Sequence, residues 1–221
     1  MSSENIDKLN RSLLHERIFL SCQNVPDKIA LQSSEDSDNY FSYNDIKTIT
    51  PQIASSLKAG GVEQQDKIGL LAENCPEWGI AYLSILCAGG IVVPLDPALK
   101  PSELASLLKL SKVKLVFVSE KLLPKINESI AAIDNDLRTI QLDTIRKLSN
   151  ETADSFLCQN IKPETPAVLI YTSGTTGDPK AVVLTHKNLL ANLDSIATAI
   201  RFYPDDIFLS LLPLFHTFEA T

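Results

Sequence analysis

Short apolar runs alternate with longer amphipathic stretches along most of the chain. The short runs predict buried strands at residues 29–31, 67–71, 91–93, 114–119, 137–142 and 167–170. Between them, apolar residues recur at helical spacing, as at Leu122, Ile126, Ile130 and Ile133. Strands of nearly continuous apolar character separated by helices are typical of a parallel sheet covered on both faces. We therefore predict an α/β fold, a parallel β-sheet with helices on both faces.

Polar and turn-forming residues indicate where the helices begin and end. Ser42 is expected to cap a helix that closes at Gly60-Gly61, whereas Pro51 argues against an unbroken helix there. Asn74 is expected to open the next helix, over residues 76–88. These boundaries place each helix between two predicted strands.

Composition and charge narrow the classes of function. The chain has 221 residues, 44% of them hydrophobic, which is enough for a packed core. It carries 20 Lys and Arg against 27 Asp and Glu, a net charge of −7, and it has no basic run. A nucleic-acid partner is therefore disfavoured. The longest charge-free stretch, residues 78–95, is shorter than the roughly 20 apolar residues that span a bilayer, so no transmembrane segment is predicted.

The N-terminus and the cysteines predict a cytoplasmic protein. The first residues, MSSENIDKLNR, lack the basic start and apolar middle of a secretory signal. The cysteines are far apart and form no C-x-x-C pair, so we expect reduced thiols at Cys22, Cys75, Cys87 and Cys158. The three histidines are equally isolated along the chain, and a histidine-based structural metal site is not expected.

The most informative segment reads YTSGTTGDPK and covers residues 171–180, between two apolar runs. Glycines let backbone N–H groups approach an anion, hydroxyls add neutral donors, and a lysine adds a compact positive charge. Such a loop is suited to a triphosphate. It does not match G-x-x-x-x-G-K-[ST], which disfavours a Walker-type NTPase. The alternative is a plain hairpin loop rich in Ser, Thr and Gly.

These residues resemble the adenylate-forming (AMP-binding) enzymes, which include acyl-CoA synthetases, acyl-carrier-protein ligases and peptide-synthetase adenylation domains. YTSGTTGDPKAVVLTHKNL resembles their nucleotide-binding loop. DKIGLLAENCPEWGIAYLSILCAGGIVVPLDP and LPLFHTFE resemble their flanking motifs. Ala181 and Gln65 stand where the family usually has glycine.

The resemblance implies an ATP site in the loop. The residues that would wrap the β- and γ-phosphates are Thr172, Ser173, Gly174, Thr175, Thr176, Gly177 and Lys180. Thr172 would also lie near Mg²⁺, which prefers oxygen ligands; the alternative is a hydroxyl that caps the loop backbone. Without its phosphate, the segment 173–178 is expected to be mobile.

His216 and His186 are expected to have different roles. The resemblance places His216 near the acyl substrate and its carboxylate, as the candidate catalytic residue; the alternative is a buried histidine satisfied by a carbonyl. His186 follows Thr185, the expected N-cap of a helix over residues 187–200, and is read as a first-turn residue. Trp78 and Tyr82, one helical turn apart, are expected to pack in the core.

The resemblance also implies that the chain is the front portion of a large N-terminal domain. Family members are more than twice as long, and their acidic motif, ribose-binding aspartate and C-terminal lysine would lie beyond Thr221. We therefore expect residues 62–203 to form a first α/β subdomain with the phosphate loop, and residues 1–61 and 204–221 to form part of a second. The fragment alone is expected to be inactive and to self-associate.

The predicted activity is that of an ATP-dependent acid–thiol ligase. It would convert a carboxylic acid, with a fatty acid preferred, to an acyl-adenylate and then to a thioester with coenzyme A or a carrier-protein phosphopantetheine. The alternative is a stand-alone nucleotide-binding or regulatory module without catalysis.

Overall fold

The computed structural model describes residues 13–133, 137–150, 156–172, 180–203 and 205–216. Within these ranges, the helices are too short or too polar to cross a membrane. The helices and strands, in chain order, are α2 (Leu14–Cys22), β1 (Ile29–Gln32), β2 (Tyr40–Ser42), α3 (Tyr43–Ala59), β3 (Lys67–Leu71), α4 (Pro76–Cys87), β4 (Ile91–Leu95), α5 (Pro101–Ser111), β5 (Leu115–Val118), α6 (Leu123–Ala131), β6 (Arg138–Gln141), α7 (Ile145–Asn150), β7 (Pro166–Thr172), β8 (Lys180–Thr185) and α8 (His186–Ala199). Short 3₁₀ turns, Glu120–Leu122 and Leu142–Thr144, precede α6 and α7.

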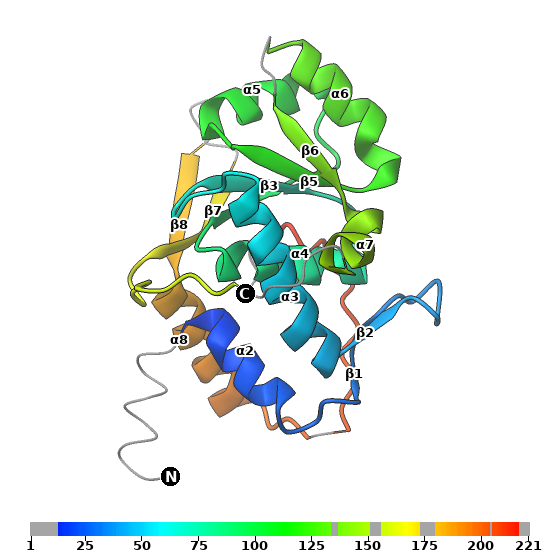
Figure 1. Ribbon diagram of the computed structural model, residues 1–221, viewed down its shortest axis with the longest axis vertical. Coiled ribbons are helices and arrows are strands. Elements are labelled where there is room, and N and C mark those ends of the chain that lie inside the picture. The colour runs from blue at the N-terminus through cyan, green and yellow to red at the C-terminus, as the bar shows by residue number, and fades with distance from the viewer. Residues whose placement is uncertain (1–12, 134–136, 151–155, 173–179, 204, 217–221) are drawn as a thin grey trace.

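The central sheet is mostly parallel, as the sequence predicts. Its strand order is β6-β5-β3-β4-β7-β8, and neighbouring strands from β6 to β7 run parallel. Strand β8 pairs antiparallel with β7, which makes one edge of the sheet a hairpin. A separate antiparallel pair, β1 and β2, lies beside α3 (Figure 1).

Two hydrophobic cores lie on opposite faces of this sheet, because successive side chains of a strand point to opposite faces. Leu115 and Phe117 of β5 belong to the core that α4 covers, whereas Val116 and Val118 belong to the core that α5 and α6 cover. In Figure 1, α5 and α6 lie above the sheet, and α3 and α4 lie below it. The prediction of helices on both faces is thus confirmed.

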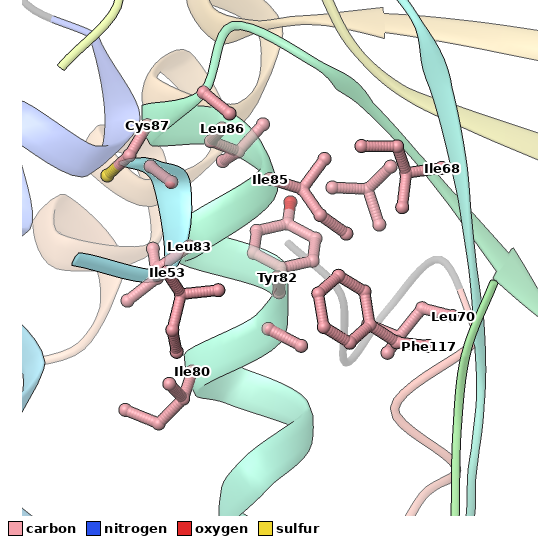
Figure 2. Packing of buried hydrophobic residues seen from close by; sticks show 14 of the residues in the cluster. Ile53, Ile68, Leu70, Ile80, Tyr82, Leu83, Ile85, Leu86, Cys87 and Phe117 are labelled. Atoms are coloured by element: carbon pink, nitrogen blue, oxygen red, sulfur yellow. The ribbon is translucent and has the colours of Figure 1, made fainter. Parts of the chain in front are cut away.

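Helix α4 is buried on nearly all sides, because it lies between the sheet and the outer helices (Figure 2). The rings of Trp78 and Tyr82 stack with their centroids 5.3 Å apart and are only 3% and 6% exposed. The predicted core role of this pair is confirmed. Burial also raises the pKa of the Tyr82 hydroxyl far above its usual value.

Helix α3 spans the predicted range between Ser42 and Gly60, but the break expected at Pro51 is wrong, because the helix continues through this residue. An internal proline costs about 3 kcal/mol, but a fully buried Ile or Leu side chain contributes about 1.5–3 kcal/mol. One face of α3 buries four such side chains, those of Ile46, Ile49, Ile53 and Leu57. The predicted cap is confirmed, since Asp45 N donates to Ser42 Oγ at 3.1 Å. Burial and capping together outweigh the proline.

Two glycines with positive φ allow a matched test of packing beside α4. Gly61 (φ +85°) has open space where a Cβ would lie, whereas a Cβ on Gly89 (φ +79°) would lie 2.6 Å from Cys158 Sγ. Cys158 is held in place, because its N–H donates to Cys87 O at 2.8 Å. We expect Gly61→Ala to cost about 1 kcal/mol, the backbone penalty alone. Gly89→Ala should cost about 2–4 kcal/mol, because overpacking adds to the same penalty.

Urea unfolding of the two variants measures this difference. Equal losses in the two variants would contradict the close packing of Cys158 on Gly89.

Candidate functional site

The strand order creates a crevice between β3 and β4. The loop after β3 leads to α4 on one face of the sheet, and the loop after β4 leads to α5 on the other. Open α/β sheets bind ligands at such a point, outside the carboxyl ends of the strands. This edge of the sheet is therefore the candidate site.

A hollow of about 330 Å³ lies at this edge. Three segments line it, namely residues 72–74 after β3, residues 96–98 after β4, and Leu211, Pro213 and Phe215. Glu73 and Asp96 contribute carboxylates to a lining that is otherwise mostly apolar. Ser119, which follows β5, donates its hydroxyl to Glu73 Oε2 at 2.7 Å. The hollow can therefore hold a mainly apolar group beside a polar rim.

Asn74 does not cap helix α4 as the sequence predicts. The cap position is Cys75, and Pro76 is the first helical residue, whose missing N–H costs nothing there. The Asn74 amide instead bonds to a distant segment: Nδ2 donates to Leu212 O, and Oδ1 accepts from Leu214 N, both at 2.8 Å. Long-range pairing has thus replaced the expected local cap.

The phosphate-loop residues begin and end at the base of the β7–β8 hairpin. Thr172 and Lys180 are direct partners in the antiparallel register, so their side chains lie on the same face. Both are exposed. Because Val168 and Ile170 of β7 belong to the core that α4 covers, the period of two places Thr172 on that face as well. Ser173, Gly174, Thr175, Thr176 and Gly177 lie outside the described residues, as does the predicted mobility of the segment 173–178.

Thr172 is a suitable ligand for Mg²⁺, because this ion prefers oxygen donors and the side chain offers a hydroxyl. The residue is also exposed beside the crevice edge. Its hydroxyl also donates to Lys180 O at 3.5 Å, a contact at the limit of hydrogen bonding. That contact favours the alternative, a backbone cap, only weakly. The metal role stays a prediction.

His216 follows Phe215, which lines the hollow. The imidazole is exposed in this chain, which argues against the alternative of a buried histidine. Its backbone N–H donates to Pro213 O at 2.9 Å, which closes a turn at the end of the segment. The structure thus places His216 directly after a residue of the crevice; its catalytic role stays a prediction.

The other two histidines meet far from this edge. His186 begins α8 after the predicted cap Thr185, whose hydroxyl accepts from Asn188 N at 3.2 Å. Its ring lies 5.9 Å from that of His15 on α2, and both side chains are buried. Burial, aided by the neighbouring His186, lowers the pKa of His15 to about 3, and burial lowers that of His186 to about 4. Both are therefore neutral near pH 7.

None of the four cysteines is disulfide-bonded, as predicted, and all are described by the structure. Burial raises the pKa of the Cys75 thiol to about 12, and it also raises the pKa values of Cys22, Cys87 and Cys158. A thiolate is the nucleophilic form of cysteine. These cysteines are therefore poor nucleophiles at neutral pH.

Sequence reasoning missed Glu73, Asn74 and Asp96 as residues of the crevice. A signal was present, because each is a polar residue that lies within three residues of the end of a buried apolar strand. What the sequence could not show is that β3 and β4 are neighbours, which brings these polar residues together.

Together these features define an α/β protein with a ligand crevice at the carboxyl edge of its sheet. The model of the AMP-binding enzyme family matches residues 18–221, and the chain belongs to this family of adenylate-forming enzymes. The chain is 31% identical over 229 residues to 4-coumarate–CoA ligase 1 of Arabidopsis thaliana, covering 95% of this chain and 40% of that enzyme. It is 30% identical over 194 residues to 4-coumarate–CoA ligase 1 of Solanum tuberosum, covering 83% of this chain and 35% of that enzyme.

Solved structures agree with the family. ATP-bound MatB from Rhodopseudomonas palustris superposes with a TM-score of 0.81 at 25% identity, covering 95% of this chain and 42% of that protein. A long-chain-fatty-acid-CoA ligase, FadD1, from Archaeoglobus fulgidus has a TM-score of 0.84 at 22% identity, covering 95% of this chain and 43% of that protein. The second likeness shows the fold alone. The chain thus spans less than half the length of these relatives.

Proposed function

We propose that these residues form the ATP-binding front part of an acid–thiol ligase, which we call the parent enzyme. A carboxylate oxygen attacks the α-phosphorus of ATP and releases pyrophosphate, and a thiol then displaces AMP from the acyl-adenylate. The observation that carries this proposal is the position of Thr172 and Lys180, at the base of the phosphate loop on the same sheet edge as the crevice. Family membership supports it.

The proposed role of each residue follows from its position. Lys180 and the hydroxyls of the loop hold the phosphates, and Thr172 supplies an oxygen for Mg²⁺, which neutralises phosphate charge when bound. His216, after the crevice residue Phe215, orients the carboxylate of the acid. Fixing both reactants in this way removes much of the entropic barrier to attack.

The proposed acid has an apolar tail, because the hollow is lined mostly by apolar groups. We propose a fatty acid, with coenzyme A or a carrier-protein phosphopantetheine as the thiol. A second candidate is an aromatic acid of the 4-coumarate type, favoured by the 31% identity to the Arabidopsis ligase.

We also propose that residues 62–203 fold as the first subdomain. For the parent enzyme we propose a cytoplasmic location, which the free thiols at all four cysteines favour.

Carboxylate-dependent exchange of labelled pyrophosphate into ATP tests the proposal. We expect the parent enzyme to catalyse exchange with fatty acids of graded length and with 4-coumarate, and we expect the best substrate to identify the acid class. The 221-residue chain alone should give none. ATP binding without exchange for any acid would favour the alternative, a nucleotide-binding or regulatory module.

A further inference from the structure

Asn74 joins two parts of the molecule that lie far apart in sequence. Its amide donates to the carbonyl of Leu212 and accepts from the N–H of Leu214, at 2.8 Å each. A side-chain amide that pairs with the C=O of one residue and the N–H of the residue two further on reproduces the pairing of a neighbouring β-strand. Two bonds of this kind fix the register of a segment, because a shift of one residue breaks both.

The base of this contact is rigid. Asn74 lies in the short loop between β3 and α4, and β3 lies in the middle of the sheet between β5 and β4. Helix α4 is buried on nearly all sides, as Figure 2 shows. The loop is therefore held at both ends by core elements.

The segment that Asn74 holds has little regular structure of its own. Residues 205–216 form no helix or strand, and Ile207 and Phe208 are 93% and 71% exposed. At the point of the Asn74 contact the segment turns inward. Leu214 packs against the core on the α4 side, and Phe215 lines the hollow.

We propose that Asn74 is a positioning residue that sets the register of residues 211–216 over the crevice. A segment held at Leu212 and Leu214 places Phe215 in the hollow and His216 at its edge. This inference rests on the proposed function for the role of His216, whereas the contact itself does not. Loss of the Asn74 amide leaves Thr172 on β7 and Lys180 on β8 in place, and it frees the segment that faces the acid.

Amide hydrogen exchange in the 221-residue chain tests the contact. We expect the Leu214 N–H to exchange about tenfold faster or more in Asn74→Ala, because the hydrogen bond from this N–H to Asn74 Oδ1 is lost. Asn74→Asp keeps the acceptor but turns a carboxylate oxygen toward Leu212 O, so its effect should be intermediate. Asn127→Ala, at an exposed asparagine on α6, is the matched control and should leave Leu214 unchanged. Unchanged exchange in Asn74→Ala would overturn the proposal.

Steady-state kinetics of the parent enzyme test the positioning role. We expect Asn74→Ala to lower kcat/KM for the acid by about tenfold or more, since misplacement of a reacting group is costly, and to leave KM for ATP within about twofold. Equal losses toward ATP and acid, or no loss at all, would overturn the role. If the unmodified enzyme shows no acid-dependent exchange, the proposed function fails, and hydrogen exchange at Leu214 still decides the contact.

Discussion

Lys180→Ala is expected to slow adenylate formation in the parent enzyme for every acid. The loss should be about 2–4 kcal/mol in transition-state stabilisation, the usual effect of removing a positioned charge donor. The reason is local, because Lys180 is exposed at the base of the phosphate loop, opposite Thr172. Pyrophosphate exchange measures the loss, and Lys109→Ala on α5, an exposed lysine on another element, is the control.

His216→Ala is the counterpart in the same assay. Because His216 follows the crevice residue Phe215, its removal should change the relative rates of acids of different length and leave ATP affinity nearly unchanged. If His216→Ala weakens ATP binding as much as Lys180→Ala does, while the acid preference stays fixed, the division of work between the two residues is wrong.

Acidification is expected to destabilise the chain well above the pH at which most carboxylates titrate. His15 and His186 titrate near 6.5 when unfolded, but their folded-state pKa values are lowered to about 3 and about 4. Between the folded-state and unfolded-state pKa values, the unfolded state binds more protons than the folded state. The stabilising effect of the two neutral histidines is therefore full above pH 6.5, and it is lost as the pH falls below this value. Each histidine contributes up to about 1.4 kcal/mol per pH unit. Together they should remove about 4 kcal/mol between pH 7.5 and 5.

Urea unfolding at several pH values measures this loss. Among the described residues, the charged groups on these two helices include Glu16, which bonds to Leu13 N, the Arg17–Asp194 ion pair that joins α2 to α8, and Lys187, which pairs with Glu164. In His15→Leu and His186→Leu the slope of stability against pH should fall by about half, whatever the stability at neutral pH. A slope that both variants leave unchanged would show that other groups cause the acid sensitivity.

The sequence predicts those features of the fold that depend on local patterns. The apolar run 114–119 identifies β5, and its continuous hydrophobicity reflects burial on both faces of the sheet. Ser42 and Thr185 are recognisable as caps, because the group that each satisfies lies three residues away. The antiparallel pairing of β8 with β7 is not recognisable in this way, since an apolar strand carries no direction in its composition.

The features that sequence reasoning missed depend on residues far apart in the chain. Asn74 resembles a helix cap in isolation, and only the fold brings Leu212 and Leu214 to it. His15 and His186 are isolated in sequence, and the packing of α2 on α8 joins them. Pro51 is tolerated because the buried face of α3 outweighs a local penalty. In each case tertiary contacts override a local preference.

The fate of the carboxylate oxygen tests the central claim most directly. The parent enzyme would be given an acid labelled with ¹⁸O in both carboxylate oxygens, ATP, Mg²⁺ and coenzyme A, and the products would be analysed by mass spectrometry. Attack on the α-phosphorus leaves one labelled oxygen in AMP when the thiol displaces it, and none in pyrophosphate. Label in inorganic phosphate with formation of ADP would show attack on the γ-phosphorus and would contradict the proposed adenylation.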